Sequence, residues 1–159
     1  MKYQRIELYV SRLLLLGSLV YILLEWNQMP NIIPSHFNGI GEIDHYDEKS
    51  SIFMIFICIL VVHICFITLE KNIENWKVSI LVRVQKNTPI YRMIYMMLTI
   101  IHLICMISML ILIVYSIRGS NLPNLFPMLM ILGILLPVCV IVIKLLWESW
   151  KEYHKYEDI

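Results

Sequence analysis

The sequence has few charged residues and few cysteines. Asp, Glu, Lys and Arg together make up 16% of its 159 residues, whereas soluble domains carry about a quarter. All four cysteines fall inside long apolar runs, where we interpret them as small apolar fillers rather than as a disulfide framework or a metal cluster. They are Cys58, Cys65, Cys105 and Cys139.

Signals for nucleic-acid binding and for a cofactor are also missing from the sequence. The formal net charge is only +1, and basic residues do not alternate with aromatic ones in any segment. No metal-ligand spacing of the H-E-x-x-H kind is present. We therefore expect no nucleic-acid partner and no cofactor, and we name no catalytic residue and no metal ligand from the sequence.

Long apolar runs are what the sequence has in abundance. Hydrophobic residues make up 59% of the chain, and about 20 apolar residues suffice to cross a bilayer core roughly 30 Å thick. We predict an all-α integral membrane protein in which residues 1–159 form a single membrane domain. Its four transmembrane helices are expected at about 6–26, 52–69, 93–117 and 127–150.

The first run is expected to remain as a helix rather than to be cleaved as a signal peptide. Basic residues precede it, but the sequence that follows is Glu25-Trp26-Asn27, where a cleavage site needs small residues. Arg12 lies within the run, and its long side chain can extend towards the headgroups.

The distribution of Lys and Arg predicts the orientation in the membrane. The segment between the second and third runs and the N-terminus are rich in cations, whereas residues 25–51 have one cation, Lys49. Under the positive-inside rule, both termini then face the cytoplasm of a multi-pass cell-membrane protein. The cationic residues that decide this are Lys2, Arg5, Arg12, Lys71, Lys77, Arg83, Lys86 and Arg92.

Two connecting segments are long enough to have structure of their own. The outer loop, residues 27–51, contains several apolar residues and prolines, so we expect it to be ordered and to lie against the helix ends. In the cytoplasmic loop, residues 70–92, apolar and polar residues alternate from Lys77 to Val84, which fits a strand. A short interfacial helix also fits, with Trp76 at the membrane boundary and the cations among the headgroups.

A short motif occurs twice, once after each helix that runs outward. "MPNIIP" at 29–34 and "LPNLFP" at 122–127 share the pattern apolar-Pro-Asn-apolar-apolar-Pro. One interpretation is that the chain consists of two duplicated helix hairpins. The alternative is that Pro and Asn simply favour helix exits.

The longest polar stretch, "MPNIIPSHFNGIGEIDHYDEK" at 29–49, is the main candidate for a functional site. Asn38-Gly39 is a turn dipeptide and Gly41 adds a second permissive position. A chain that folds back at 38–41 brings His36 close to Asp44. Such a group could bind a metal, act in acid–base catalysis with a serine, or hydrogen-bond the backbone of the loop.

The same stretch resembles the signature of a bacterial membrane family that is described as a domain of unknown function and is related to the SdpI immunity protein. The family pattern is roughly L-P-x-x-I-P-x-H-[FW]-[ND]-x-x-G-x-x-D followed by a Lys. Before that Lys this chain has Asp47 and Glu48 where the family often has a small residue. On this resemblance the marked residues are Pro30, Pro34, His36, Phe37, Asn38, Gly41, Asp44 and Lys49.

Two histidines, His63 and His102, fall inside predicted helices. Ionisable groups within a bilayer are costly and usually face other protein or a cavity. At 1.5 Å per residue, His63 lies about 9 Å and His102 about 14 Å from the cytoplasmic end, so they can meet if their helices are neighbours. We expect each neutral imidazole to bond a nearby backbone, Ser or Thr group. The alternative is a proton relay or a metal pair, although no acidic residue in the helix interiors supports a relay.

The resemblance implies recognition of, or immunity to, a secreted toxic peptide through the outer loop. The sequence leaves two alternatives open. One is a membrane enzyme, with or without a metal, that uses His36 and Asp44; the other is a small sensor or accessory subunit. The expected partners are the lipid bilayer and a secreted peptide, with a cytoplasmic regulator or a second copy of the chain as further options.

Overall fold

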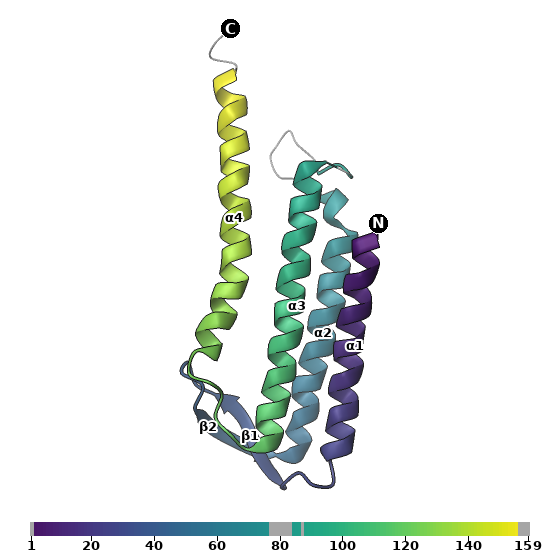
Figure 1. The fold of residues 1–159 in the computed structure, drawn as a ribbon, viewed down its shortest axis with the longest axis vertical. Helices are drawn as coiled ribbons and strands as arrows, with labels where there is room; N and C mark the ends of the chain where they lie inside the picture. Colours follow the sequence, from purple (N-terminus) through teal and green to yellow (C-terminus); the bar gives the residue numbers. More distant parts are fainter. Residues whose placement is uncertain (1, 77–83, 87, 156–159) are drawn as a thin grey trace.

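The computed structural model describes residues 2–76, 84–86 and 88–155, and it is mostly helical (Figure 1). Its long helices are α1 (Lys2–Glu25), α2 (Ile52–Lys71), α3 (Pro89–Arg118) and α4 (Phe126–Lys155). Two single 3-10 turns, η1 (Lys49–Ser51) and η2 (Ile73–Asn75), flank α2.

Four helices are long and apolar enough to cross a membrane, as expected from the sequence. The candidate spans are Ile6–Glu25, Lys49–Lys71, Pro89–Arg118 and Phe126–Glu148. Helices of this length and composition imply a lipid bilayer environment. The third begins earlier than expected because Pro89 occupies the first helical turn and the Thr88 side chain caps it, accepting a hydrogen bond from the Tyr91 amide.

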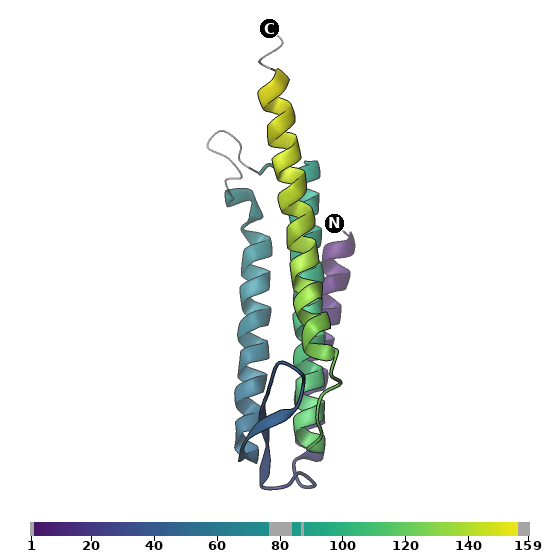
Figure 2. The same cartoon turned by 90° about the vertical axis from the view of Figure 1, so that its left-hand side faces the viewer.

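Helices α1, α2 and α3 form a three-helix bundle, and α4 packs along α3 (Figures 1 and 2). Glycine at position 133 allows the close approach of α4, because a Cβ there would lie 3.1 Å from the Ile104 side chain. Both termini lie at one end of the molecule, and the segment that joins α1 to α2 lies at the other (Figure 1). We call these the termini end and the hairpin end.

The segment between α1 and α2 is ordered, but it contains two strands, so the protein is mostly helical rather than all-α. It folds into an antiparallel β-hairpin of β1 (Ile32–Phe37) and β2 (Ile43–Glu48). The fold-back around 38–41 agrees with the prediction. The strands were not predicted because β2 is rich in Asp and Glu, which have low strand propensity. Burial of Ile33 and Pro34 from β1 against the helix ends anchors the hairpin.

Gly41 attaches the hairpin to the connection between α3 and α4. It has a φ of +86°, and a Cβ at this position would lie 2.9 Å from the Leu122 carbonyl oxygen. Its own carbonyl accepts a hydrogen bond of 2.8 Å from the Leu122 amide. Next to it, the Asn121 side chain accepts one of 2.9 Å from the Ile43 amide. Because Ile43 and Asn121 are 78 residues apart in the sequence, these contacts join two distant connections.

The two copies of the repeated motif adopt different structures. "MPNIIP" leads into β1, whereas "LPNLFP" leads directly into α4, which has Pro127 in its first turn. The duplication therefore stays a prediction. The strand and helix alternatives for the 70–92 loop fall largely on residues 77–83, which lie outside the described residues, and they stay predictions as well.

We predict that Gly41→Ala loosens the hairpin. A left-handed conformation costs a residue with a Cβ about 1–2 kcal/mol, and the contact with Leu122 adds to this cost. Amide hydrogen exchange of residues 32–48 in detergent micelles should become about tenfold faster or more. Gly39→Ala is the matched control, because Gly39 has no positive φ and a Cβ added there would meet no atom within 4 Å. Equal exchange in the two variants would contradict this role of Gly41.

Candidate functional site

His36 and Asp44 come together on the hairpin, as the sequence predicted. The His36 Nδ1 atom lies 2.6 Å from the Asp44 Oδ1 atom. The two side chains are 68% and 42% exposed. An ion pair this exposed contributes at most about 1 kcal/mol to stability. The fold therefore does not require this pair, and it remains accessible to a ligand.

Asn38, in contrast, has a clear structural role. Its side-chain oxygen accepts hydrogen bonds of 3.0 Å from the amides of Ile40 and Glu42, which forms the turn between the strands. The Asn38 amide donates to the Glu42 carbonyl at 2.8 Å, which closes the hairpin. Its side-chain nitrogen also contacts the Glu42 carboxylate at 3.2 Å.

The remaining residues of the resemblance are spread over the hairpin end. Pro34 is fully buried and Pro30 is exposed. The Lys49 ammonium lies 4.8 Å from the centre of the Trp26 ring, a cation–π contact that fixes the start of α2 against the end of α1. Phe37 is half-buried and faces a cavity.

A cavity of about 320 Å³ lies between the hairpin and the helix ends. Its hairpin wall is formed by Ser35, His36, Phe37 and Asn38, and Leu122, Phe126 and Pro127 form the facing wall. Apolar side chains of α2 and α3, among them Ile55 and Met109, form its floor. The cavity thus offers an apolar surface with a histidine at its edge, which is typical of a binding site.

A catalytic interpretation of His36 and Asp44 requires a nucleophile within reach. The contact between Nδ1 and the carboxylate would orient the imidazole as a general base. Among the described residues, however, none of the sequence candidates Ser35, Ser50 and Ser51 forms a hydrogen bond with His36. The described residues therefore show His36 paired with Asp44 but not with a serine.

The intramembrane histidines meet each other, as their depths in the helices suggest. The His63 Nδ1 atom of α2 lies 3.1 Å from the His102 Nε2 atom of α3. His102 is fully buried and stacks on the Phe66 ring with a centroid separation of 5.0 Å. The expectation that each imidazole bonds a backbone, Ser or Thr group is therefore wrong.

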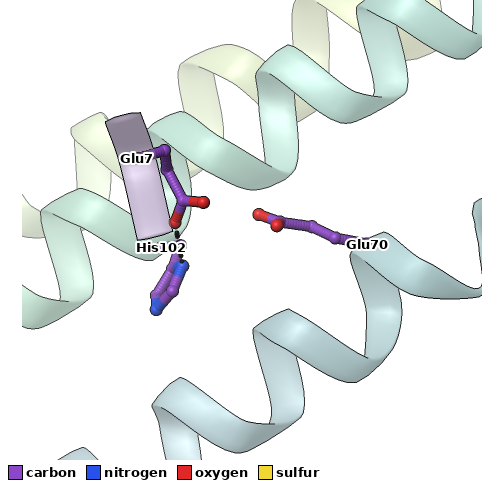
Figure 3. A group of neighbouring side chains, drawn as sticks. All are labelled: Glu7, Glu70 and His102. Carbon is purple, nitrogen blue, oxygen red and sulfur yellow. Dashed lines mark ion pairs between the residues drawn. The ribbon is translucent and has the colours of Figure 1, made fainter. Parts of the chain in front are cut away.

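The expectation that the helix interiors hold no acidic residue is also wrong. Glu7 of α1 is 4% exposed, and its Oε1 atom forms an ion pair of 2.6 Å with the His102 Nδ1 atom (Figure 3). Glu70, in the last turn of α2, is 8% exposed, and its carboxylate points towards Glu7 and His102 (Figure 3). We call Glu7, His63, Glu70 and His102 the buried polar cluster.

Sequence reasoning missed the acidic half of this cluster for two reasons. Glu7 lies near the start of the expected first helix but was not considered as a partner for a histidine, and Glu70 lies just beyond the expected end of the second helix, whereas α2 continues to Lys71. The available signal was the rule that an ionisable residue in a transmembrane segment usually has a partner. Applied to Glu7, it would have suggested one of the two histidines.

Residues 13–60 match the family model of a domain of unknown function, DUF1648. The matched segment covers less than a third of the chain and includes the second half of α1, the whole hairpin and the first turns of α2. No curated protein and no solved structure shows significant similarity to the chain. The match contains the hairpin residues His36, Asn38, Asp44 and Lys49, whereas the whole buried polar cluster lies outside it.

We predict that Asn38→Ala and His36→Ala affect the hairpin differently. Loss of Asn38 removes two accepted hydrogen bonds, worth about 1 kcal/mol each, whereas loss of the exposed His36 pair costs at most about 1 kcal/mol. Amide exchange across residues 32–48 should be about tenfold faster in Asn38→Ala and nearly unchanged in His36→Ala. A larger effect of His36→Ala would show that the His36–Asp44 pair stabilises the fold.

Proposed function

We propose that this is a membrane recognition protein whose hairpin binds a secreted toxic peptide and so protects the membrane of the cell that makes it. In this proposal the hairpin end faces outward, and both termini face the cytoplasm. The excess of Lys and Arg at the N-terminus and in the 69–92 segment supports this orientation. The resemblance of the hairpin sequence to SdpI-type immunity proteins supports the protective role.

The observation that carries the proposal is the exposed His36–Asp44 pair at the edge of an apolar cavity. The pair is short, at 2.6 Å, yet 68% and 42% exposed, so it adds little to stability. A cavity of about 320 Å³ directly beside it is lined by His36 and Phe37. A polar pair that folding does not require, next to an unfilled apolar surface, is a combination suited to ligand binding.

This geometry fits a peptide with both apolar and polar groups. An apolar side chain of the peptide enters the cavity against Phe37, Leu122 and Phe126. The backbone or a polar side chain of the peptide then hydrogen-bonds the His36 ring or the Asp44 carboxylate, both of which retain free capacity. In this proposal Asn38 and Gly41 fix the shape of the hairpin, and Lys49 anchors it to Trp26.

The test is the killing of a gene-deletion strain by spent medium from its parent. The strain is complemented with wild type, with His36→Ala or with Glu48→Gln, at equal membrane levels. We expect wild type and Glu48→Gln to restore survival and His36→Ala to lose most of the protection. Glu48 is a matched control because it is an exposed residue at the far end of the same hairpin.

Two results would contradict the proposal. If the deletion strain is not sensitive to the medium, the protein does not provide immunity under these conditions. If His36→Ala protects as well as wild type, the His36–Asp44 pair is not part of the recognition surface, whatever the protein protects against.

A further inference from the structure

The buried polar cluster at the other end of the bundle has no role in the proposed recognition function. Its four residues come from three helices: Glu7 from α1, His63 and Glu70 from α2, and His102 from α3. All four are at least nine-tenths buried. They also lie in segments that are apolar enough to cross a membrane, where ionisable groups are rare and usually functional.

The carboxylates of this cluster have buried oxygens that receive no hydrogen bond. Glu7 Oε2 and Glu70 Oε1 are inaccessible to solvent, and neither has a hydrogen-bond partner in the part of the chain that the structure describes. Burial of a carboxylate oxygen without a partner costs several kcal/mol. Figure 3 shows that the Glu70 carboxylate points into the space beside Glu7 and His102. The two glutamates thus converge on one point with unused lone pairs.

We propose that Glu7, Glu70 and His102 bind a divalent transition-metal ion of the zinc type. One donor atom from each residue lies within 4.8 Å of the others. In a tetrahedral site, ligand atoms about 2.1 Å from the metal are about 3.4 Å apart, so side-chain movements of about 1–1.5 Å bring the three donor atoms to bonding distance. The two negative charges of the glutamates balance the charge of the ion.

The donor types favour a transition metal over Ca²⁺ or Mg²⁺. Imidazole nitrogen suits zinc, iron and nickel, whereas calcium and magnesium sites are built from oxygen ligands alone. The metal is bound through His102 Nδ1, the ring atom that faces Glu7 at 2.6 Å. Binding displaces any proton on this nitrogen, which leaves to solvent.

His63 acts as a positioning residue for His102. Its Nδ1 atom contacts the opposite ring nitrogen of His102, Nε2, at 3.1 Å. When His102 Nε2 carries the proton, it donates to His63 and keeps Nδ1 free for the metal. Metal-bound histidines in proteins commonly have such a partner on the second nitrogen, and loss of that partner lowers metal affinity roughly 10- to 100-fold.

A cavity at the termini end reaches one of the three proposed ligands. Glu70 also lines a cavity of about 280 Å³, together with Lys71, Glu74, Lys86, Tyr91 and Tyr95. The Lys86 Nζ atom lies 3.1 Å from the Glu74 Oε1 atom. Lys86 therefore forms an ion pair with Glu74. Glu70 thus lines the cavity and has a carboxylate oxygen within 4.8 Å of the donor atoms of Glu7 and His102, so in this proposal the ion enters past Glu70.

The experiment measures Zn²⁺ binding to the untagged full-length chain in detergent micelles after chelator treatment. Equilibrium dialysis with elemental analysis gives the stoichiometry, and thermal unfolding with and without Zn²⁺ gives a second reading. We expect one Zn²⁺ per chain and a higher unfolding temperature with the ion. Glu70→Gln should weaken binding by about tenfold or more, and His63→Gln by roughly 10- to 100-fold. Excess Mg²⁺ or Ca²⁺ should not compete.

Glu74→Gln is the matched control, because Glu74 is an exposed carboxylate of the same cavity outside the buried cluster. It should bind Zn²⁺ as wild type does. Glu70 lies in the last turn of α2, so Glu70→Gln tests the site even if a change at Glu7 prevents folding. Absence of stoichiometric Zn²⁺ in wild type, displacement by Mg²⁺ or Ca²⁺, or unchanged affinity in Glu70→Gln would overturn the proposal.

Discussion

The buried ion pair between Glu7 and His102 is the interaction on which the arrangement of α1, α2 and α3 depends. Inside a bilayer, apolar side chains gain little by leaving lipid for protein, so they select helix neighbours only weakly. A carboxylate and an imidazole that contact each other at 2.6 Å in a nearly solvent-free interior allow few alternative packings. Rotation of α1 away from α3 would leave both groups unpaired in hydrocarbon. His63 extends the same constraint to α2.

At the hairpin end, polar contacts have a different structural role. Its polar groups are mostly exposed, and their contacts determine the shape of a surface rather than the packing of helices. Asn38 forms the turn, and Gly41 fastens that turn to Leu122 in the connection between α3 and α4. Helix α4 packs on α3, so the Gly41–Leu122 contact also holds its first turn close to the hairpin. The 320 Å³ cavity is lined both by hairpin residues and by residues of the connection between α3 and α4 and the start of α4.

The sequence predicted the four helices and the fold-back at 38–41 because both have strong local signals. Apolar runs of about 20 residues have few alternatives to a membrane span, and Asn38-Gly39 favours a turn whatever surrounds it. The pairing of His36 with Asp44 followed directly from that turn. The strands were not predictable in the same way, because β2 contains Asp44, Asp47 and Glu48 and pairs with β1 against its own propensity.

The buried polar cluster could be predicted only in part, because it depends on contacts between different helices. The depth of His63 and His102 in their helices suggested that they meet. Glu70 lies just past the expected end of the second helix, where a shift of one or two residues changes a loop residue into a helical one. Which faces of the three helices meet is decided by contacts between residues far apart in the sequence, such as Glu7 and His102. Local sequence patterns do not contain that information.

The hydrogen bond between His63 and His102 gives the most direct test of this three-helix arrangement. Nitrogen NMR of histidine-labelled protein detects scalar coupling between two ring nitrogens that share a proton. We expect coupling between His63 Nδ1 and His102 Nε2, and its loss in His63→Gln. A spectrum in which all histidine ring nitrogens are uncoupled, from protein that is folded and helical, would contradict the packing of α2 against α3 at the cluster.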